Sequence, residues 1–136
     1  MTSILKILII FIIFGVLGFV AEGTLFNKPC LDLLGSRFNS NLQIPFCPVH
    51  GFGGIIIYLT TVNLPQLNDV SLTLLLTLFI TTLECFSGKI SNWFHYGKHT
   101  WKYQGGTACD GYISLEVSLI WFILIFMFLK LFRTYL

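Results

Sequence analysis

Four apolar stretches dominate this 136-residue chain, and their length constrains the fold more than any other feature. A helix needs about 20 residues to cross the bilayer core. Only 10% of the residues are charged, too few to cover the surface of a water-soluble domain. We therefore predict an all-α, polytopic membrane protein, multi-pass in the cell or cytoplasmic membrane. It is expected to form one helical transmembrane domain over residues 1–136, with spans at 4–26, 47–64, 70–88 and 112–132.

The second apolar stretch, Gly51 to Leu64, is short and begins with GFGG. A full span there needs residues from Pro45 to His50, so we predict an irregular entry rich in proline and glycine. Irregular backbone persists at membrane depth only where protein or a water-filled cavity covers it. The segment PFCPVHGFGG is therefore expected to lie inside the bundle.

Threonine recurs every four residues in the third stretch, at Thr73, Thr77 and Thr81. This spacing stacks the three side chains on one face of a helix. Their hydroxyl groups are placed to bond back to the helix or across to a neighbouring one.

Four crossings put both termini on one side of the membrane and the loops 27–47 and 88–110 on the other. Five basic residues lie on the loop side, against three on the terminal side, Lys6, Lys130 and Arg133. The positive-inside rule therefore favours cytoplasmic loops by a narrow margin. Lys130 and Arg133 are suited to reach lipid headgroups. The hairpin 65–69 has no basic residue and is predicted to be only a turn.

Three carboxyl groups fall at the ends of predicted spans, at Glu22, Glu84 and Glu116. A charge near the bilayer centre costs at least about 2.5 kcal/mol, so such groups usually mark a site or a pairing. The alternation of spans places all three on one membrane face, at the level of Arg37, Lys89 and other polar residues. A shared polar site is favoured for Glu22 and Glu84. For Glu116, pairing with Lys89 or with water is an equal alternative.

The four cysteines, Cys30, Cys47, Cys85 and Cys109, stand far apart and form no CxxC pair. This spacing indicates neither a zinc site nor a redox dithiol. A Cys47–Cys109 disulfide is possible if their loops share a membrane face. The favoured interpretation is that membrane cysteines are small apolar fillers.

The segment 91–103, SNWFHYGKHTWKY, interleaves aromatic and basic residues. Such segments settle among lipid headgroups, and membrane lipids are the expected contact. His95 and His99 are spaced for one helix face, but Gly97 between them disfavours a firm helix, so a metal site is not favoured. No metal and no cofactor are expected.

Motifs for catalysis are missing from the sequence. It contains neither GxSxG nor the phosphate-binding loop GxxxxGK[ST], so it cannot hydrolyse ATP by that route. No catalytic residues are assigned, and an enzyme is the less favoured class. Eight basic residues against six acidic ones are too few for a nucleic-acid-binding face, so no nucleic-acid partner is expected.

Several motifs in order resemble the bacterial family of ABC-transporter type IV proteins, also called CmpB-like permeases. They are Gly18 and Glu22, Arg37, PFCPVHGFG at 45–53, Glu84, WFH at 93–95 with WKY at 101–103, and DGYISLEVSLIW at 110–121. The resemblance covers about residues 14–126. It departs at Phe38 for glycine, His50 for tyrosine, Lys102 for aspartate and Asp110 for asparagine. The added histidine and aspartate imply a changed ligand.

The resemblance implies a membrane permease that works with a separate ATPase. Four helices hardly enclose a transport route, so a homo-oligomer or a partner membrane or ATPase subunit is expected. A small membrane-embedded protein that binds or modifies lipids is the alternative, and a structural scaffold is a third. The expected substrate-binding residues are Glu22, Arg37, Pro45, Cys47, His50, Gly51, Gly53, Glu84, Trp101, Tyr103, Asp110, Gly111 and Glu116.

Overall fold

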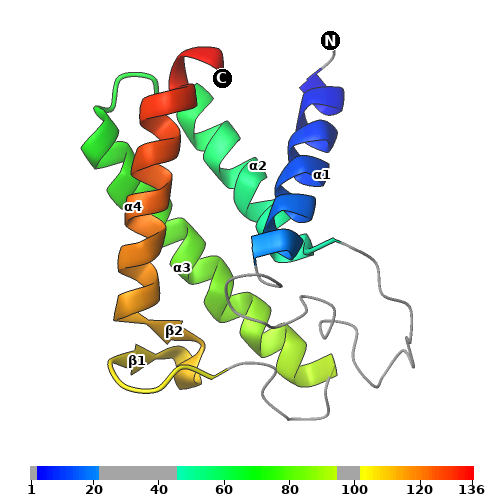
Figure 1. Cartoon of the computed structure of the whole chain (residues 1–136), viewed down its shortest axis with the longest axis vertical. Coiled ribbons are helices and arrows are strands. Elements are labelled where there is room, and N and C mark those ends of the chain that lie inside the picture. Colours follow the sequence, from blue (N-terminus) through cyan, green and yellow to red (C-terminus); the bar gives the residue numbers. More distant parts are fainter. Residues whose placement is uncertain (1–2, 22–45, 95–101) are drawn as a thin grey trace. The chain divides into compact units, whose positions relative to one another are not determined.

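The protein is mostly helical in a computed structural model that describes residues 3–21, 46–94 and 102–136. This part of the chain holds four α-helices, shown in Figure 1: α1 (Ser3–Ala21), α2 (Pro48–Asn63), α3 (Asp69–Phe94) and α4 (Leu115–Phe132). Between α3 and α4 lie the short strands β1 (Thr107–Ala108) and β2 (Ile113–Ser114) with the 3₁₀ turn η3 (Cys109–Gly111). A second 3₁₀ turn, η4 (Arg133–Tyr135), follows α4.

Three described segments are long and apolar enough to cross a membrane: Ile4–Ala21, Asp69–Phe94 and Leu115–Tyr135. They contain 18, 26 and 21 residues, against the roughly 20 that a bilayer core requires. Most of their side chains are not buried inside the protein. An apolar surface of this kind is stable against lipid tails and unstable in water, which confirms a membrane-embedded helical protein.

The chain forms two compact units, and α2 and α3 each belong partly to both. Unit 1 contains residues 1–55 and 86–101, and unit 2 contains residues 56–85 and 102–136.

In unit 1, α1 packs against the start of α2 through glycines. A Cβ atom added to Gly15 would lie 2.0 Å from the ring of Phe46, and one added to Gly18 would lie 2.2 Å from the ring of His50. From the other side, Gly51 faces Phe11 in the same way. The missing side chains therefore admit the rings, which is how small residues bring membrane helices together.

The second helix begins at Pro48, a residue whose fixed φ and missing N–H suit a first helical position. The GFGG sequence lies within this helix rather than before it. Only Phe46 and Cys47 are non-helical among the described residues that precede it, and the Cys47 N–H donates to the carbonyl of Gly15 at 2.8 Å.

In unit 2, α3 begins with a side-chain cap. The carboxamide oxygen of Asn68 accepts the N–H of Ser71 at 2.8 Å, which satisfies one of the free amides of the first turn. Leu72, Leu76 and Ile80 of α3 are buried, as are Ile125 and Leu129 of α4. These residues recur at helical spacing and form the apolar core of the unit.

Candidate polar site on α3 and α4

The centre of the candidate site is Glu84, near the middle of the long helix α3. Glu84 is only 8% exposed, and its Oε1 accepts a hydrogen bond of 2.8 Å from the indole Nε1 of Trp121 on α4. Both residues belong to unit 2. A buried carboxyl group in a spanning helix is costly unless it is hydrogen-bonded. Trp121 supplies such a bond, and Glu84 is buried inside the protein.

The predicted threonine face of α3 is also confirmed. The hydroxyl groups of Thr73 and Thr77 donate to the carbonyl oxygens of Asp69 and Thr73, four residues earlier. The hydroxyl of Thr81 lies 3.3 Å from that of Ser118 on α4. Thr81 and Ser118 therefore add a second polar contact between the helices, less than one turn away from the Glu84–Trp121 bond.

A small hairpin over residues 102–114 lies beside this end of α3. Thr107 and Ala108 pair with Ser114 and Ile113 in antiparallel register. The N–H of Tyr103 donates to the carbonyl of Gly111 at 2.8 Å, and Tyr112 is only 2% exposed.

The predicted site residues Asp110 and Gly111 both have positive φ, 58° and 89°. Gly111 suits this conformation, and the Lys102 side chain packs where a Cβ would stand, 2.7 Å away. Asp110 is exposed at the turn. The turn therefore fixes the backbone of Asp110 without burying its carboxyl group.

The hairpin is attached to α3 by a disulfide between Cys85 and Cys109, whose Cα atoms are 5.8 Å apart. The pairing of Cys47 with Cys109 considered from the sequence is therefore wrong. The sequence analysis favoured cysteines as apolar fillers, but Cys85 forms a covalent bond. Cys85 follows Glu84 directly, at the level where the hairpin packs. Glu84 thus lies next to a covalent connection between α3 and the hairpin.

At the other end of unit 2, a charged cluster joins α3 to α4. Asp69 forms ion pairs with Lys130 at 2.7 Å and with Arg133 at 2.6 Å. Arg133 also donates to the carbonyl oxygens of Pro65 and Leu67. The turn between α2 and α3 is therefore held by Arg133, and the two basic residues contact protein where the sequence suggested lipid headgroups.

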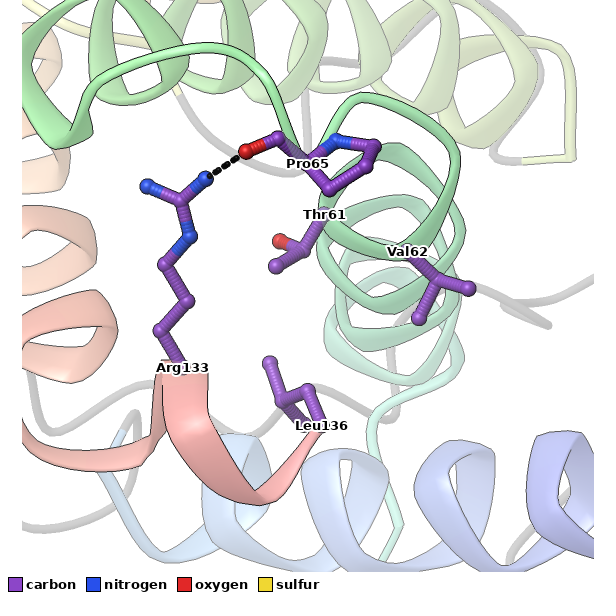
Figure 2. A pocket seen from close by; sticks show the side chains of 5 residues that line it. All are labelled: Thr61, Val62, Pro65, Arg133 and Leu136. Atoms are coloured by element: carbon purple, nitrogen blue, oxygen red, sulfur yellow. Dashed lines mark hydrogen bonds between the residues drawn. The ribbon is translucent and has the colours of Figure 1, made fainter.

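A cavity of about 250 Å³ opens beside Arg133, lined by Thr61, Val62, Pro65, Arg133 and Leu136. Figure 2 shows the guanidinium group of Arg133 directed at the carbonyl of Pro65, with Thr61 and Leu136 at the wall. Sequence reasoning missed this cluster. Its signal was present, because Asp69 opens a span and two basic residues close another, which are matching levels in an antiparallel pair.

In unit 1, four predicted site residues lie at the start of α2. Cys47 is fully buried, and its Sγ lies 2.9 Å from Nδ1 of His50. Gly51 and Gly53 are buried too, and Gly51 is in contact with Phe11. Gly51 therefore has a packing role, which sequence reasoning did not assign to it.

The remaining predicted residues are not gathered at Glu84 by any described contact. Glu116 is exposed in the first turn of α4, where a carboxylate complements the helix dipole. Glu22, Arg37, Pro45 and Trp101 lie outside the described residues, as do His95 and His99. Within residues 3–21, 46–94 and 102–136, no group of three His, Cys, Asp or Glu side chains is arranged to hold a metal.

A family model described as "Putative ABC-transporter type IV" matches residues 9–136, nearly the whole chain. The chain belongs to this family. Comparisons with curated proteins and with solved structures found no match. As an ABC-transporter type IV protein with three helices able to cross a bilayer, the chain is a multi-pass membrane protein related to transport.

Proposed function

We propose that the chain is a permease-like subunit of a transport system, in the cell membrane, with a polar substrate site around Glu84. Family membership supports the transport context. The observation that carries the site is the buried carboxyl group of Glu84, bonded by Trp121 inside a pair of long apolar helices. A carboxylate in a low-dielectric setting attracts cations and hydrogen-bond donors strongly.

The proposed subunit is one helical transmembrane domain with four spans. Helix α2 is the fourth, with its Pro/Gly-rich entry at residues 45–54. Its 16 residues measure about 24 Å, less than the bilayer core of about 30 Å. The non-helical residues Phe46 and Cys47 extend it and are attached to α1, which supports residues 47–64 as a complete span.

The proposed site lies in unit 2 and has Glu84, one of the substrate-binding residues predicted from the sequence, as its centre. Trp121, Thr81 and Ser118 are added because they contact each other or Glu84 across α3 and α4. Trp121 orients the carboxyl group, and the two hydroxyl groups offer further polar contacts within one helical turn. The hairpin carries Tyr103, Asp110 and Gly111, and the disulfide attaches it to Cys85, the residue that follows Glu84.

Two kinds of partner are proposed. The sequence lacks a phosphate-binding loop, so energy from ATP must come from a separate ATPase subunit. Four helices hardly enclose a route for a solute, so further copies of the chain or another membrane subunit complete it. Lipids cover the many apolar side chains that point away from the protein on α1 and α4.

The test compares Glu84→Gln with wild type in cells that lack the native gene. Glutamine keeps the size of the side chain and the acceptor for Trp121 but removes the charge. Metabolites and ions are compared without preselection, inside the cells and in the medium, at equal membrane levels of each protein. The matched control is Thr82→Ala, which removes an exposed hydroxyl from the same helix.

Wild type and Thr82→Ala should reverse whatever change in solute levels the deletion causes. Glu84→Gln should reverse that change about tenfold less effectively or worse, since a bond to a charged group contributes about 1.5–3 kcal/mol. Full restoration by Glu84→Gln would remove Glu84 from the proposed site.

A further inference from the structure

The helices of unit 2 carry two chemically different groups, one toward each end of the α3–α4 pair. Asp69 and Cys85 lie on the same helix, and their sequence separation of 16 corresponds to about 24 Å along its axis. Asp69 pairs with Lys130 and Arg133 beyond the middle of α4, whereas Cys85 is bonded to Cys109, which precedes α4. The two helices are therefore antiparallel, with the ion-pair cluster at one end and the disulfide toward the other.

The disulfide end is held together by more than the sulfur atoms. The hairpin is closed by the Tyr103–Gly111 bond and by the pairing of β1 with β2. Cys109 itself has a φ of 53°, a left-handed conformation that few L-residues adopt. The backbone thus holds Cys109 at the position where it meets Cys85, with a Cα separation inside the usual range for a disulfide.

A disulfide of this kind identifies the compartment that it faces. Disulfides persist on the oxidising side of cell membranes and are rare where cytosolic reductants reach them. From this chemistry we propose that the Cys85–Cys109 end of unit 2 faces the oxidising, extracytoplasmic side, and that the Lys130–Arg133 end faces the cytoplasm.

The bond forms by exchange with a disulfide-bearing oxidant of that compartment. The thiolate of one cysteine attacks a sulfur of the oxidant, which breaks the oxidant's disulfide and gives a mixed disulfide. The second cysteine, as thiolate, then attacks the protein sulfur of this mixed disulfide. The Cys85–Cys109 bond forms, the oxidant leaves as its dithiol, and the two protons of the protein thiols pass through solvent to the products.

This orientation is opposite to the one that the count of basic residues favours. That count is five against three, a bias that one or two residues reverse. The redox chemistry separates the two compartments far more sharply. Two of the three basic residues on the terminal side, Lys130 and Arg133, lie at the C-terminal end of the α4 span, and basic residues close to a span end are the ones that bias orientation.

The orientation does not rest on the proposed function, but it has a consequence for it. Glu84 directly precedes Cys85, so the polar site lies toward the extracytoplasmic end of the helix pair. A solute outside the cell would meet Glu84 before it met the ion-pair cluster. A cytoplasmic ATPase would contact the opposite end, which carries Asp69, Lys130 and Arg133.

The experiment uses the full chain with its native cysteines. Intact cells are treated with a membrane-permeant maleimide before lysis, and the digested protein is searched by mass spectrometry for a peptide linking Cys85 to Cys109. In parallel, Leu136 is fused either to a fluorescent protein that matures only in the cytoplasm or to a phosphatase that is active only outside. Neither readout needs a cysteine variant that must fold.

The proposal predicts the linked peptide, a fluorescent fusion and an inactive phosphatase. Two free, maleimide-modified thiols at Cys85 and Cys109 would overturn it. An active phosphatase with a dark fluorescent fusion would overturn it as well, whatever the state of the cysteines. As a matched check, Cys85→Ser should convert Cys109 from almost unmodified to almost fully modified, while Ser87→Ala, a neighbour on the same helix, should leave Cys109 protected.

Discussion

The two units join their helices by different means. In unit 1, the contact of α1 with α2 depends on missing side chains, because Gly15 and Gly18 leave room for the rings of Phe46 and His50. In unit 2, the contact of α3 with α4 depends on specific bonds: an indole–carboxyl hydrogen bond, a hydroxyl pair and ion pairs. Unit 1 is therefore sensitive to added volume, and unit 2 to lost polar partners.

This difference bears on function. Close packing through glycines leaves little space for water or a solute, so the glycine contact serves the fold. Polar groups between membrane helices cost energy to bury and add little stability that apolar packing could not provide. The polar contacts of unit 2 are thus the better place for a substrate site.

Removal of the disulfide should have the largest effect on stability. The bond closes a loop with a sequence separation of 24, and the loop-entropy relation gives about 3.5 kcal/mol for it. Unfolding of Cys85→Ser, Cys109→Ser and the double variant is measured in lipid bicelles. Because one bond is lost in each case, the two single variants and the double variant should be equally destabilised. Single variants as stable as wild type would show that the bond does not hold the hairpin.

Added volume in unit 1 should come next. Alanine is normally the better helix former by about 1 kcal/mol, so Gly18→Ala would stabilise α1 if space were available. Because the new Cβ would stand 2.2 Å from His50, we expect a net loss of about 2–3 kcal/mol. The same unfolding assay measures it. Val16→Ala, at an exposed position of the same helix, is the control and should change stability by less than about 0.5 kcal/mol. A stable Gly18→Ala protein would refute the glycine contact.

A lost hydrogen bond in unit 2 should have a smaller effect. Trp121→Phe keeps an aromatic ring but removes the N–H that bonds Glu84, at a cost of about 2 kcal/mol. A double-mutant cycle with Glu84→Leu isolates the pair. Once Glu84 is leucine, Trp121→Phe should cost clearly less than it does in wild type. Strictly additive losses would mean that the two side chains do not interact.

The hydroxyl pair should give the smallest effect. Ser118→Ala leaves Thr81 able to bond elsewhere, and interhelical hydroxyl bonds in membranes average about 0.6 kcal/mol. Unfolding in bicelles should therefore show a shift of that size. Thr82→Ala, whose hydroxyl bonds only within its own helix, should show none. Equal shifts in both variants would argue against a contact between Thr81 and Ser118.

Periodicity and length in the sequence were sufficient for much of the fold. The apolar stretches gave four helices, and the four-residue spacing of Thr73, Thr77 and Thr81 gave their hydroxyl bonds. The cost of burying a carboxyl group drew attention to Glu84, together with Glu22 and Glu116. Each of these inferences depends on local sequence and on the bilayer as solvent, so no knowledge of the tertiary structure was needed.

Pairings between distant residues could not be predicted in the same way. Four cysteines allow several pairings, and Cys85 is selected as the partner of Cys109 only by the hairpin turn that positions Cys109. The roles of Asp69 and Arg133 depend on the register of α3 against α4, which periodicity does not define. Trp121 lies in a motif shared with the family, but its bond to Glu84 depends on the same register of α3 against α4. Conversely, Glu116 looked like Glu84 in sequence but is exposed in the structure.

A membrane subunit of a transport system must bind partner subunits, so the decisive measurement identifies what this chain binds. The protein is extracted mildly from its own membrane, and native mass spectrometry identifies every polypeptide, lipid and small molecule that remains bound. We expect an ATP-binding subunit at fixed stoichiometry, together with two or more membrane subunits. A bare chain, or a small oligomer that retains one lipid class and no ATPase, would contradict it and favour a lipid-directed function.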